Sequence, residues 1–468
     1  MTLQFRNTLT RRTEPFVPLA PGRAGIYTCG PTVYDHAHLG NLRTFMFEDL
    51  LVRHLAWRGF AVFRVMNLTD VDDKTIRGAR EAGLSLDAFT RPFKDAFFAD
   101  LETLRIRPAD VYPAATDHTE AMIGMIGALI ERGHAYQAGD GSVYFRIESF
   151  PEYGKLARID RAGLKPGARV DQDEYEKEQV GDFALWKAWT EKDGDVAWDS
   201  PWGRGRPGWH IECSAMSTQY LGPTFDIHCG GVDNLFPHHE DEIAQSECCT
   251  GKPFVRYWLH SAHLIVEGRK MSKSEGNFFT LPQILDQGWT GREVRYLLLS
   301  THYRQQLNFT FDGLKAARTS LHRLDELRRR LEDRAGDAEP GGLPGFASAR
   351  REAFGAALDD DLNISGALGH LFDLVREANT ALDHDGMDPP AAAAVRDLLT
   401  EDLDHVLAVM EPDPSETGGD ADLEALLERR NRARAERNWA EADRLRDHLA
   451  DLGWKVQDGP DGSRLVKI

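Results

Sequence analysis

Residues 29–41 read Cys-Gly-Pro-Thr-Val-Tyr-Asp-His-Ala-His-Leu-Gly-Asn, and the fold prediction starts from this stretch. It separates a short apolar segment, residues 25–29, from residues 42–57, whose apolar side chains recur at helical spacing. A second apolar segment, residues 61–66, follows. This order predicts two parallel strands joined by a helix in a right-handed crossover. Ligands of such sheets bind beyond the carboxyl ends of the strands, where we expect Cys29 and Thr69 to lie.

The composition indicates a multidomain protein. Its 468 residues correspond to about three domains at roughly 150 residues each. No apolar run approaches the roughly 18 residues of a membrane span, and the N-terminus lacks the apolar core of a secretory signal. Five scattered cysteines do not indicate a disulfide framework, and a net charge of −19 argues against a general nucleic-acid coat while allowing a local basic face. We expect a cytoplasmic protein that acts as a monomer and has no membrane partner.

The rest of the chain changes character several times. Residues 116–196 break the strand and helix alternation with a charged, glycine-containing tract, and residues 225–228 restore the parallel-sheet pattern. Residues 314–410 are almost entirely helical in pattern, whereas residues 412–420 are polar with proline, serine and glycine and predict a linker. The expected fold class is α/β, with a Rossmann-like parallel-sheet domain, an insertion, a helical bundle and a small α+β C-terminal domain. The expected domains are 1–115 with 197–250 (parallel sheet), 116–196 (insertion), 251–313 (junction carrying a lysine loop), 314–412 (bundle) and 421–468 (C-terminal domain ending in a hairpin).

The first signature suited to a nucleotide is the peptide before the helix at residues 42–57. A helix start offers unpaired backbone N–H groups and a positive dipole end, both of which favour phosphate. His36 and His38 can donate hydrogen bonds to phosphate oxygens, and Gly40 lets a flat base approach the backbone closely. The alternative for this peptide alone is a turn whose histidines only cap the helix.

The second signature, residues 268–277, reads Gly-Arg-Lys-Met-Ser-Lys-Ser-Glu-Gly-Asn and follows an apolar strand predicted over residues 259–266. Its lysines, Lys270 and Lys273, can move positive charge onto a polyphosphate as pyrophosphate leaves. A single loop of this kind is usually a solvated basic turn. The combination of this loop with the upstream His-x-Gly-Asn sequence occurs by chance much more rarely than the loop alone, and it favours an ATP site.

A metal site is the third prediction. His238 and Glu242 are four residues apart and therefore share one helical face. With Cys213 and Cys29 from other segments they form a donor set that suits zinc. The alternative is a helix N-terminus with acidic residues near its positive end. His239 and Glu240 do not complete the metalloprotease pattern His-Glu-x-x-His.

The two nucleotide signatures together resemble those of the class I aminoacyl-tRNA synthetases, and the whole chain from residue 27 onward resembles the cysteinyl-tRNA synthetase family. The resemblance implies one zinc ion per chain on Cys29, Cys213, His238 and Glu242, with Mg-ATP, L-cysteine and tRNA(Cys) as substrates. It also implies an amino-acid pocket with Thr69, Trp209 and His228, and catalytic roles for His38, Lys270 and Lys273. The family's first signature more often ends in histidine, where this chain has Asn41. The ATP residues that it implies are Thr32, His36, His38, Gly40, Asn41, Asp233, Lys270 and Lys273.

The C-terminal region carries a helix with several arginines, followed by Trp439. Arginines neutralise phosphates and a tryptophan can stack on an unpaired base. The pattern alone favours the alternative, a solvated arginine face with the tryptophan in a small core. The resemblance implies anticodon contacts by Arg434, Trp439, Asp443 and Asp458.

Two other functions fit parts of the sequence. A related ligase of mycothiol synthesis has the same catalytic core and joins cysteine to an amino sugar, but it has no reason to keep an anticodon module at residues 423–468. A catalytically silent tRNA-binding protein has no reason to keep His38, Lys270 and Lys273.

Overall fold

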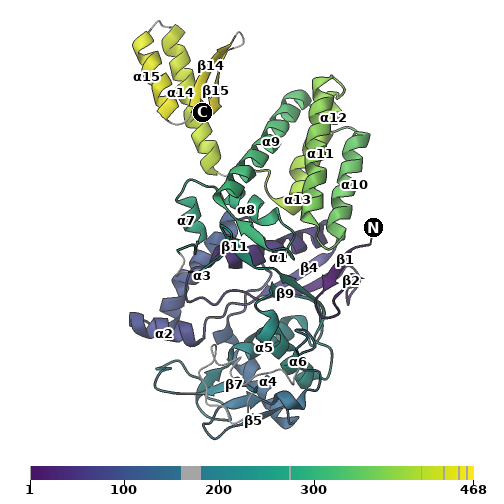
Figure 1. Cartoon of the computed structure of the whole chain (residues 1–468), viewed down its shortest axis with the longest axis vertical. Helices are drawn as coiled ribbons and strands as arrows, with labels where there is room; N and C mark the ends of the chain where they lie inside the picture. The colour runs from purple at the N-terminus through teal and green to yellow at the C-terminus, as the bar shows by residue number, and fades with distance from the viewer. Residues whose placement is uncertain are drawn as a thin grey trace. The chain divides into compact units, whose positions relative to one another are not determined.

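The computed structural model describes residues 2–159, 181–272, 276–412, 414–435, 438–451, 454–459 and 462–467. This part of the chain falls into two compact units, residues 1–289 with 293–410 and residues 411–468 with 290–292. Figure 1 shows the helices and strands of both units.

The centre of the first unit is a parallel sheet with the strand order β10-β9-β3-β4. β3 (Arg23–Thr28) pairs with β4 (Ala61–Met66) and with β9 (Phe225–Gly231), which pairs with β10 (Val255–Ser261). Helix α1 (Leu39–Trp57) connects β3 to β4, as the sequence predicts. Every residue of β9 is buried, which is typical of a parallel strand covered on both faces. The predicted α/β class is confirmed.

The sheet extends further along the chain than predicted. β10 lies beyond the expected domain boundary at residue 250, and the apolar run 259–266 is divided between β10 and the separate strand β11 (Leu264–Val266). β11 pairs with β12 (Arg269–Lys270) and β13 (Leu307–Phe309) in another sheet. An apolar run shows only that its residues are buried, and not which sheet buries them.

The insertion contains an antiparallel sheet with the order β5-β6-β7-β8. Its strands are β5 (Ala135–Gln137), β6 (Val143–Phe145), β7 (Phe183–Ala188) and β8 (Gly205–Pro207), and α4 (Thr119–Glu131) precedes them. β8 lies beyond the expected boundary at residue 196 because its Gly-Arg-Pro sequence carries no strand pattern and only its pairing with β7 defines it. Helix α5 (Trp209–Leu221) then leads to β9, and α6 (Glu240–Thr250) leads to β10.

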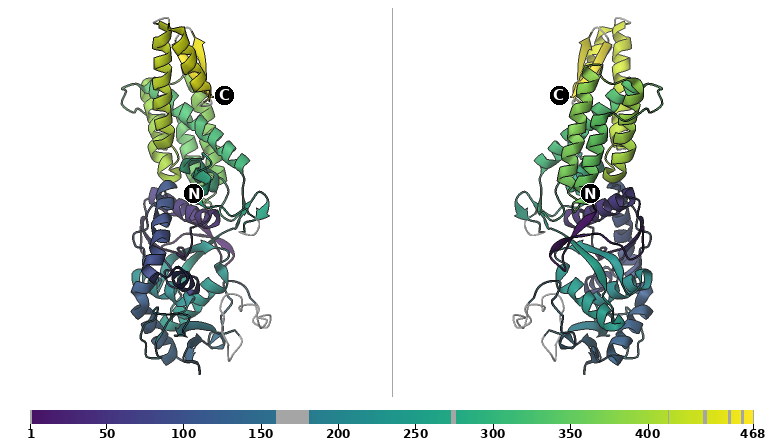
Figure 2. Two further views of the ribbon diagram at one scale, coloured as in Figure 1. Left: turned by 90° about the vertical axis from the view of Figure 1, so that its left-hand side faces the viewer. Right: turned by 90° about the vertical axis from the view of Figure 1, so that its right-hand side faces the viewer.

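The remaining elements of the first unit surround these sheets. β1 (Gln4–Asn7) and β2 (Arg12–Pro15) form an N-terminal hairpin. Helices α2 (Asp73–Ala82) and α3 (Leu86–Thr103) follow β4, and α7 (Leu281–Leu285) and α8 (Gly291–Leu299) follow β12. The predicted bundle consists of α9 (Phe311–Ala335), α10 (Gly345–Asp359), α11 (Ile364–Asp383), α12 (Pro389–Asp397) and α13 (Asp404–Leu407). The long green helices of this bundle run side by side in both views of Figure 2.

The second unit contains α14 (Pro414–Ala435), α15 (Trp439–Asp451) and the hairpin of β14 (Trp454–Gly459) and β15 (Gly462–Lys467). The hairpin agrees with the prediction. The predicted linker, residues 412–420, differs, because α14 begins at Pro414, and proline is favoured at the first position of a helix. In the described part of the chain, no helix has both the length and the apolar character needed to cross a membrane.

Candidate active site

A cavity of about 570 Å³ opens next to the carboxyl ends of β3 and β9, where the topology of the sheet predicts a ligand site. Both predicted signatures contribute to its wall. The predicted site residues that line it are Cys29, Thr32, His38, Gly40, Asn41, Thr69, Trp209, Cys213, Asp233, His238 and Lys270. The structure therefore brings eleven predicted residues from many separate segments to one cavity.

Some predicted residues lie elsewhere. The His36 ring packs against the Phe93 ring, with centroids 5.5 Å apart, and lies outside the described lining of the cavity. His228 is fully buried behind Glu242, with its Nε2 2.9 Å from Glu242 Oε2. Lys273 lies outside the residues that the structure describes.

The start of α1 shows why His38, Gly40 and Asn41 occur together. His38 Nδ1 accepts a hydrogen bond from the Asn41 backbone N–H at 3.2 Å, and Asn41 Oδ1 accepts one from the His38 N–H at 3.1 Å, which forms a capping box. A Cβ on Gly40 would lie 2.9 Å from His38 Cε1 and 3.2 Å from Met271 Cε, so a side chain there would press on the cap. The peptide thus caps the helix and lines the cavity at the same time.

The segment after the lysine loop holds this peptide from the other side. The Leu39 N–H donates to the Phe279 carbonyl at 3.0 Å, and the His38 and Phe278 rings meet edge to face with centroids 5.1 Å apart. Lys270, at the end of β12, lines the same cavity. The two signatures, more than 200 residues apart in the sequence, are therefore adjacent in space.

The predicted metal ligands lie close together, and three of them, Cys29, Cys213 and His238, line the cavity. Cys29 follows β3, Cys213 lies in α5, His238 lies in the turn Leu235–His239, and Glu242 lies in the first turn of α6. His238 Nε2 lies 3.4 Å from Cys213 Sγ and 3.1 Å from Glu242 Oε1, and Cys29 Sγ lies 3.9 Å from the same Oε1. One donor atom from each of the four residues lies within 4.8 Å of every other.

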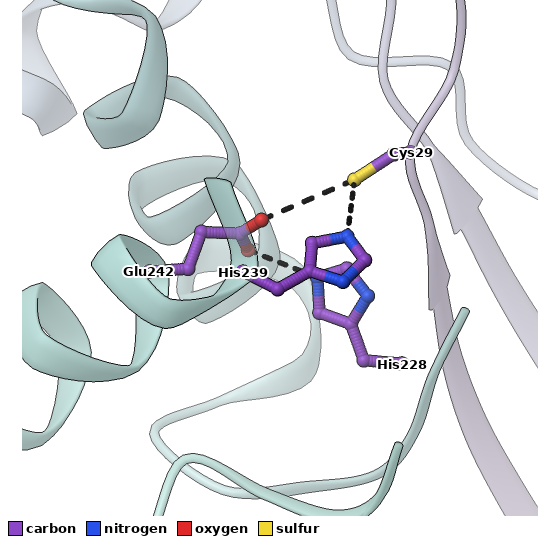
Figure 3. Close-up of side chains that lie close together, drawn as sticks. All are labelled: Cys29, His228, His239 and Glu242. Carbon is purple, nitrogen blue, oxygen red and sulfur yellow. Dashed lines mark hydrogen bonds and ion pairs between the residues drawn. The ribbon is translucent and has the colours of Figure 1, made fainter. Parts of the chain in front are cut away.

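A second donor group overlaps the first. It keeps Cys29 and Glu242 but uses His228 and His239 in place of Cys213 and His238. Figure 3 shows these four side chains pointing toward one another, with His239 Nε2 3.3 Å from Cys29 Sγ. Within the described residues, Cys229, Cys248 and Cys249 belong to neither group.

Burial strongly affects the protonation of these donors. Burial, followed by the hydrogen bond with Cys213, raises the pKa of Cys29. Burial alone would also raise the pKa of Cys213, but the Cys29 thiol as hydrogen-bond donor lowers it overall. Burial raises the pKa of Glu242 and lowers that of His238, so the imidazole is neutral at pH 7. A neutral imidazole and cysteine thiols, which lose their protons on binding a metal, are donors that a soft divalent cation binds well.

Three buried histidines around these ligands were not predicted from the sequence as site residues, namely His210, His239 and His260. His210 Nδ1 lies 2.9 Å from His238 Nδ1, and His239 Nδ1 lies 2.8 Å from His260 Nε2. The partners are 28 and 21 residues apart in the sequence. No helical or strand spacing links such pairs, and the local signals are the adjacency of His210 to Trp209 and of His239 to His238.

A parallel sheet with a capped His-x-Gly-Asn peptide beside the start of a lysine loop defines a class I aminoacyl-tRNA synthetase. Two solved structures of Mycobacterium tuberculosis methionyl-tRNA synthetase with methionyl-adenylate share this fold, with TM-scores of 0.59 and 0.62 at 17% and 15% identity. Each covers 82% of this chain, which covers 89% and 92% of those chains. Residues 15–319 match the family of class I (C) tRNA synthetase catalytic domains, residues 353–410 a DALR domain, and residues 416–464 the cysteinyl-tRNA ligase anticodon binding domain.

The similarity to individual proteins extends over the full length. The chain is 49% identical to a cysteine–tRNA ligase of Protochlamydia amoebophila, over 99% of this chain and 98% of the relative. It is 50% identical to the cysteine–tRNA ligase of Chlamydia trachomatis serovar A, over all of both chains. The chain therefore belongs to the cysteine–tRNA ligase family, as its sequence signatures predict.

Proposed function

We propose that this chain activates L-cysteine with Mg-ATP to form cysteinyl-adenylate and transfers the cysteinyl group to the 3′ end of tRNA(Cys). The observation that carries the proposal is that Cys29, Cys213 and His238, which share one donor group with Glu242, line the cavity that also contains the capped His-x-Gly-Asn peptide and Lys270. Membership of the cysteine–tRNA ligase family supports the same activity. We expect the chain to act as a monomer in the cytoplasm.

We propose that Cys29, Cys213, His238 and Glu242 hold one Zn²⁺ ion. Three separations between their donor atoms, 3.1, 3.4 and 3.9 Å, lie close to the edges of about 3.3–3.8 Å expected for a tetrahedral site with Zn–N near 2.0 Å and Zn–S near 2.3 Å. The alternative group satisfies similar distances. Three members of the proposed group, Cys29, Cys213 and His238, line the cavity, whereas His228 and His239 do not, so only the proposed group leaves a position open to substrate.

This arrangement explains selection of cysteine over serine. The two amino acids differ by one atom, and a pocket that measures size alone discriminates by only about 1–3 kcal/mol. A zinc ion supplies a soft site that binds a thiolate and lowers the pKa of a thiol, whereas a hydroxyl stays protonated. Thr69 and Trp209 line the cavity beside this position and would orient the amino acid. His228 would act from behind, by holding Glu242 Oε2 so that Oε1 faces the metal.

Catalysis would depend on positioning and charge. The carboxylate of cysteine attacks the α-phosphorus of ATP, and pyrophosphate leaves. We propose that Thr32, His38 and Gly40 hold the phosphates and adenosine together with Asn41 and Asp233, and that Lys270 and Lys273 stabilise the charge that develops on pyrophosphate. His36 would contribute by fixing the conformation of the peptide, since its ring packs on Phe93.

We propose that residues 314–412 and 421–468 bind tRNA, and that residues 116–196 form the connective insertion. Trp439 is 57% exposed at the start of α15, which suits stacking on an unpaired base. Arg434 lies in the last turn of α14, Asp443 in α15 and Asp458 in β14, and we propose that all three contact the anticodon. The match of residues 416–464 to an anticodon binding domain disfavours the amino-sugar ligase.

Amino-acid-dependent exchange between ATP and pyrophosphate tests the activity. Cysteine should support exchange and serine should not, and added tRNA(Cys) should yield acid-precipitable cysteinyl-tRNA. Exchange with cysteine but no transfer to tRNA would support the amino-sugar ligase. No exchange with either amino acid would support the silent tRNA-binding protein.

A further inference from the structure

The helix that carries Glu242 also makes a set of buried contacts with the insertion. The Glu240 carboxylate is buried and accepts hydrogen bonds from three backbone N–H groups of one turn, those of Gly154 at 2.8 Å and of Leu156 and Ala157 at 2.9 Å each. Three amide donors on one carboxylate fix the turn firmly onto the start of α6. The turn therefore cannot move without moving the metal-binding helix.

A second contact runs from the same turn toward the metal ligands. The Tyr153 hydroxyl donates to Asp241 Oδ1, and His210 Nε2 lies 3.3 Å from Asp241 Oδ2. His210 Nδ1 lies 2.9 Å from His238 Nδ1. The side chains of Tyr153, Asp241, His210 and His238 are all buried. They form a continuous path from the insertion to a proposed zinc ligand.

The contacts of His238 and Asp241 determine which ring nitrogen of each histidine on this path carries the proton. His238 Nε2 faces Cys213 and Glu242, so it is the nitrogen available to a metal, and the proton of the neutral ring must lie on Nδ1. His210 Nδ1 accepts that proton's hydrogen bond, which leaves the proton of His210 on Nε2, facing Asp241. Asp241 Oδ1 accepts the hydrogen bond of the Tyr153 hydroxyl, and Asp241 Oδ2 lies 3.3 Å from His210 Nε2 in an electrostatic contact. Every group on the path has one consistent role.

Packing fixes the two rings in the same orientation. The Trp209 ring stacks on His238 with centroids 4.3 Å apart, and the Phe183 ring meets His210 edge to face at 5.7 Å. Gln245 Nε2 donates to the His210 carbonyl at 2.9 Å. Rotation of the His238 ring would therefore break both the stack and the contact with His210.

We propose that Tyr153, Asp241 and His210 are positioning residues that fix the tautomer and orientation of His238, so that the insertion sets the metal affinity of the cavity. This inference rests on the proposed zinc site. Groups that orient a metal-binding histidine in this way usually contribute about 10- to 100-fold to metal affinity. The insertion thus has a role in amino-acid selection besides any contact with tRNA.

The test uses the full chain and zinc alone as the probe. Tyr153→Phe and Asp241→Asn should each raise the zinc Kd by about 10- to 100-fold in competition with a chromophoric chelator. The Co²⁺-loaded variants should show shifted d–d absorption, which a purely structural change elsewhere would not produce. Tyr136→Phe is the matched control, because the Tyr136 hydroxyl donates to Asp182 Oδ2 at 2.9 Å in the same insertion but far along the chain from any ligand. Its zinc Kd and Co²⁺ spectrum should equal those of the parent chain.

The outcomes separate the inference from the proposed function. If the parent binds zinc and Tyr153→Phe and Asp241→Asn both keep its Kd and Co²⁺ spectrum, the positioning role is refuted while the zinc site stands. If Tyr136→Phe loses as much affinity for zinc as Tyr153→Phe, the general stability of the insertion explains the effect, and the positioning role is also refuted. A parent chain that binds no zinc would refute the zinc site itself. Tyr153→Phe removes only one hydroxyl, so it keeps the test valid if Asp241→Asn does not fold.

Discussion

Replacement of Cys213 by serine is the sharpest test of the proposed metal site. Cys213 is 1% exposed and its Sγ lies 3.4 Å from His238 Nε2, so Cys213→Ser changes one donor atom at a buried position and almost nothing else. A serine hydroxyl stays protonated at neutral pH and is a poor ligand for a soft cation. The fold should persist, because the two side chains have nearly the same shape.

The expected loss follows from the number of ligands. A four-ligand zinc site binds with about 10–16 kcal/mol in total, or about 2.5–4 kcal/mol per ligand, so the zinc Kd should rise by about two to three orders of magnitude. At a zinc concentration about 100-fold above its Kd, the parent gains about 2.7 kcal/mol of stability from the ion, whereas a variant with a 100-fold higher Kd gains only about 0.4 kcal/mol.

Elemental analysis after dialysis and thermal unfolding with and without zinc measure both effects. Cys249→Ser is the matched control, since Cys249 is partly exposed, lies at the far end of α6 and belongs to neither described donor group. It should keep one zinc per chain and the full zinc-dependent rise in Tm. Stoichiometric zinc in Cys213→Ser would refute the ligand assignment.

Three further predictions concern tRNA, catalysis and stability. Trp439→Ala should raise the KM for tRNA about 5- to 150-fold, the equivalent of one lost stack of about 1–3 kcal/mol, and leave ATP–pyrophosphate exchange intact; an unchanged KM would place Trp439 in packing alone. Lys270→Ala should slow adenylate formation about 10²- to 10³-fold in pre-steady-state kinetics with a smaller effect on ATP binding, and the reverse pattern would contradict its role. Asp49→Asn should lower the free energy of unfolding in urea by about 3–5 kcal/mol, because it leaves the buried Arg295 guanidinium, now 2.7 Å from Asp49, without its partner. Burial alone would raise the pKa of Asp49, but Arg295 holds it below its usual value. The stability that this ion pair contributes is therefore present above about pH 4 and is lost as pH falls through the pKa of Asp49 in the folded protein. The difference should therefore shrink in acid, and Asp87→Asn, in an exposed pair, should cost less than about 1 kcal/mol throughout.

Features encoded by short spacings could be predicted from the sequence. The strand, helix and strand around residues 29–41 follow from apolar periodicity, and the His-x-Gly-Asn peptide and the lysine loop follow from their own residues. The pair His238 and Glu242 follows from a separation of four residues. In each case the chemistry lies within one or two turns of backbone, where local geometry is nearly independent of the fold.

Other features depend on partners that are distant in the sequence. The linker expected before residue 421 is mostly helix, and β8 is a strand only because β7 pairs with it. The composition of a segment limits which secondary structures it can form, and its contacts with other segments determine which one it adopts.

The metal site shows most clearly the difference between what local sequence predicts and what tertiary packing decides. Its four ligands could be chosen by residue type, but whether Cys213 and His238 or His228 and His239 complete the group with Cys29 and Glu242 depends on which of them face the cavity. The carboxyl ends of β3 and β9 meet at one edge of the sheet, where α5 packs against β3 and α6 packs against α5. That packing brings together side chains more than 200 residues apart, and no local spacing in the chain records it.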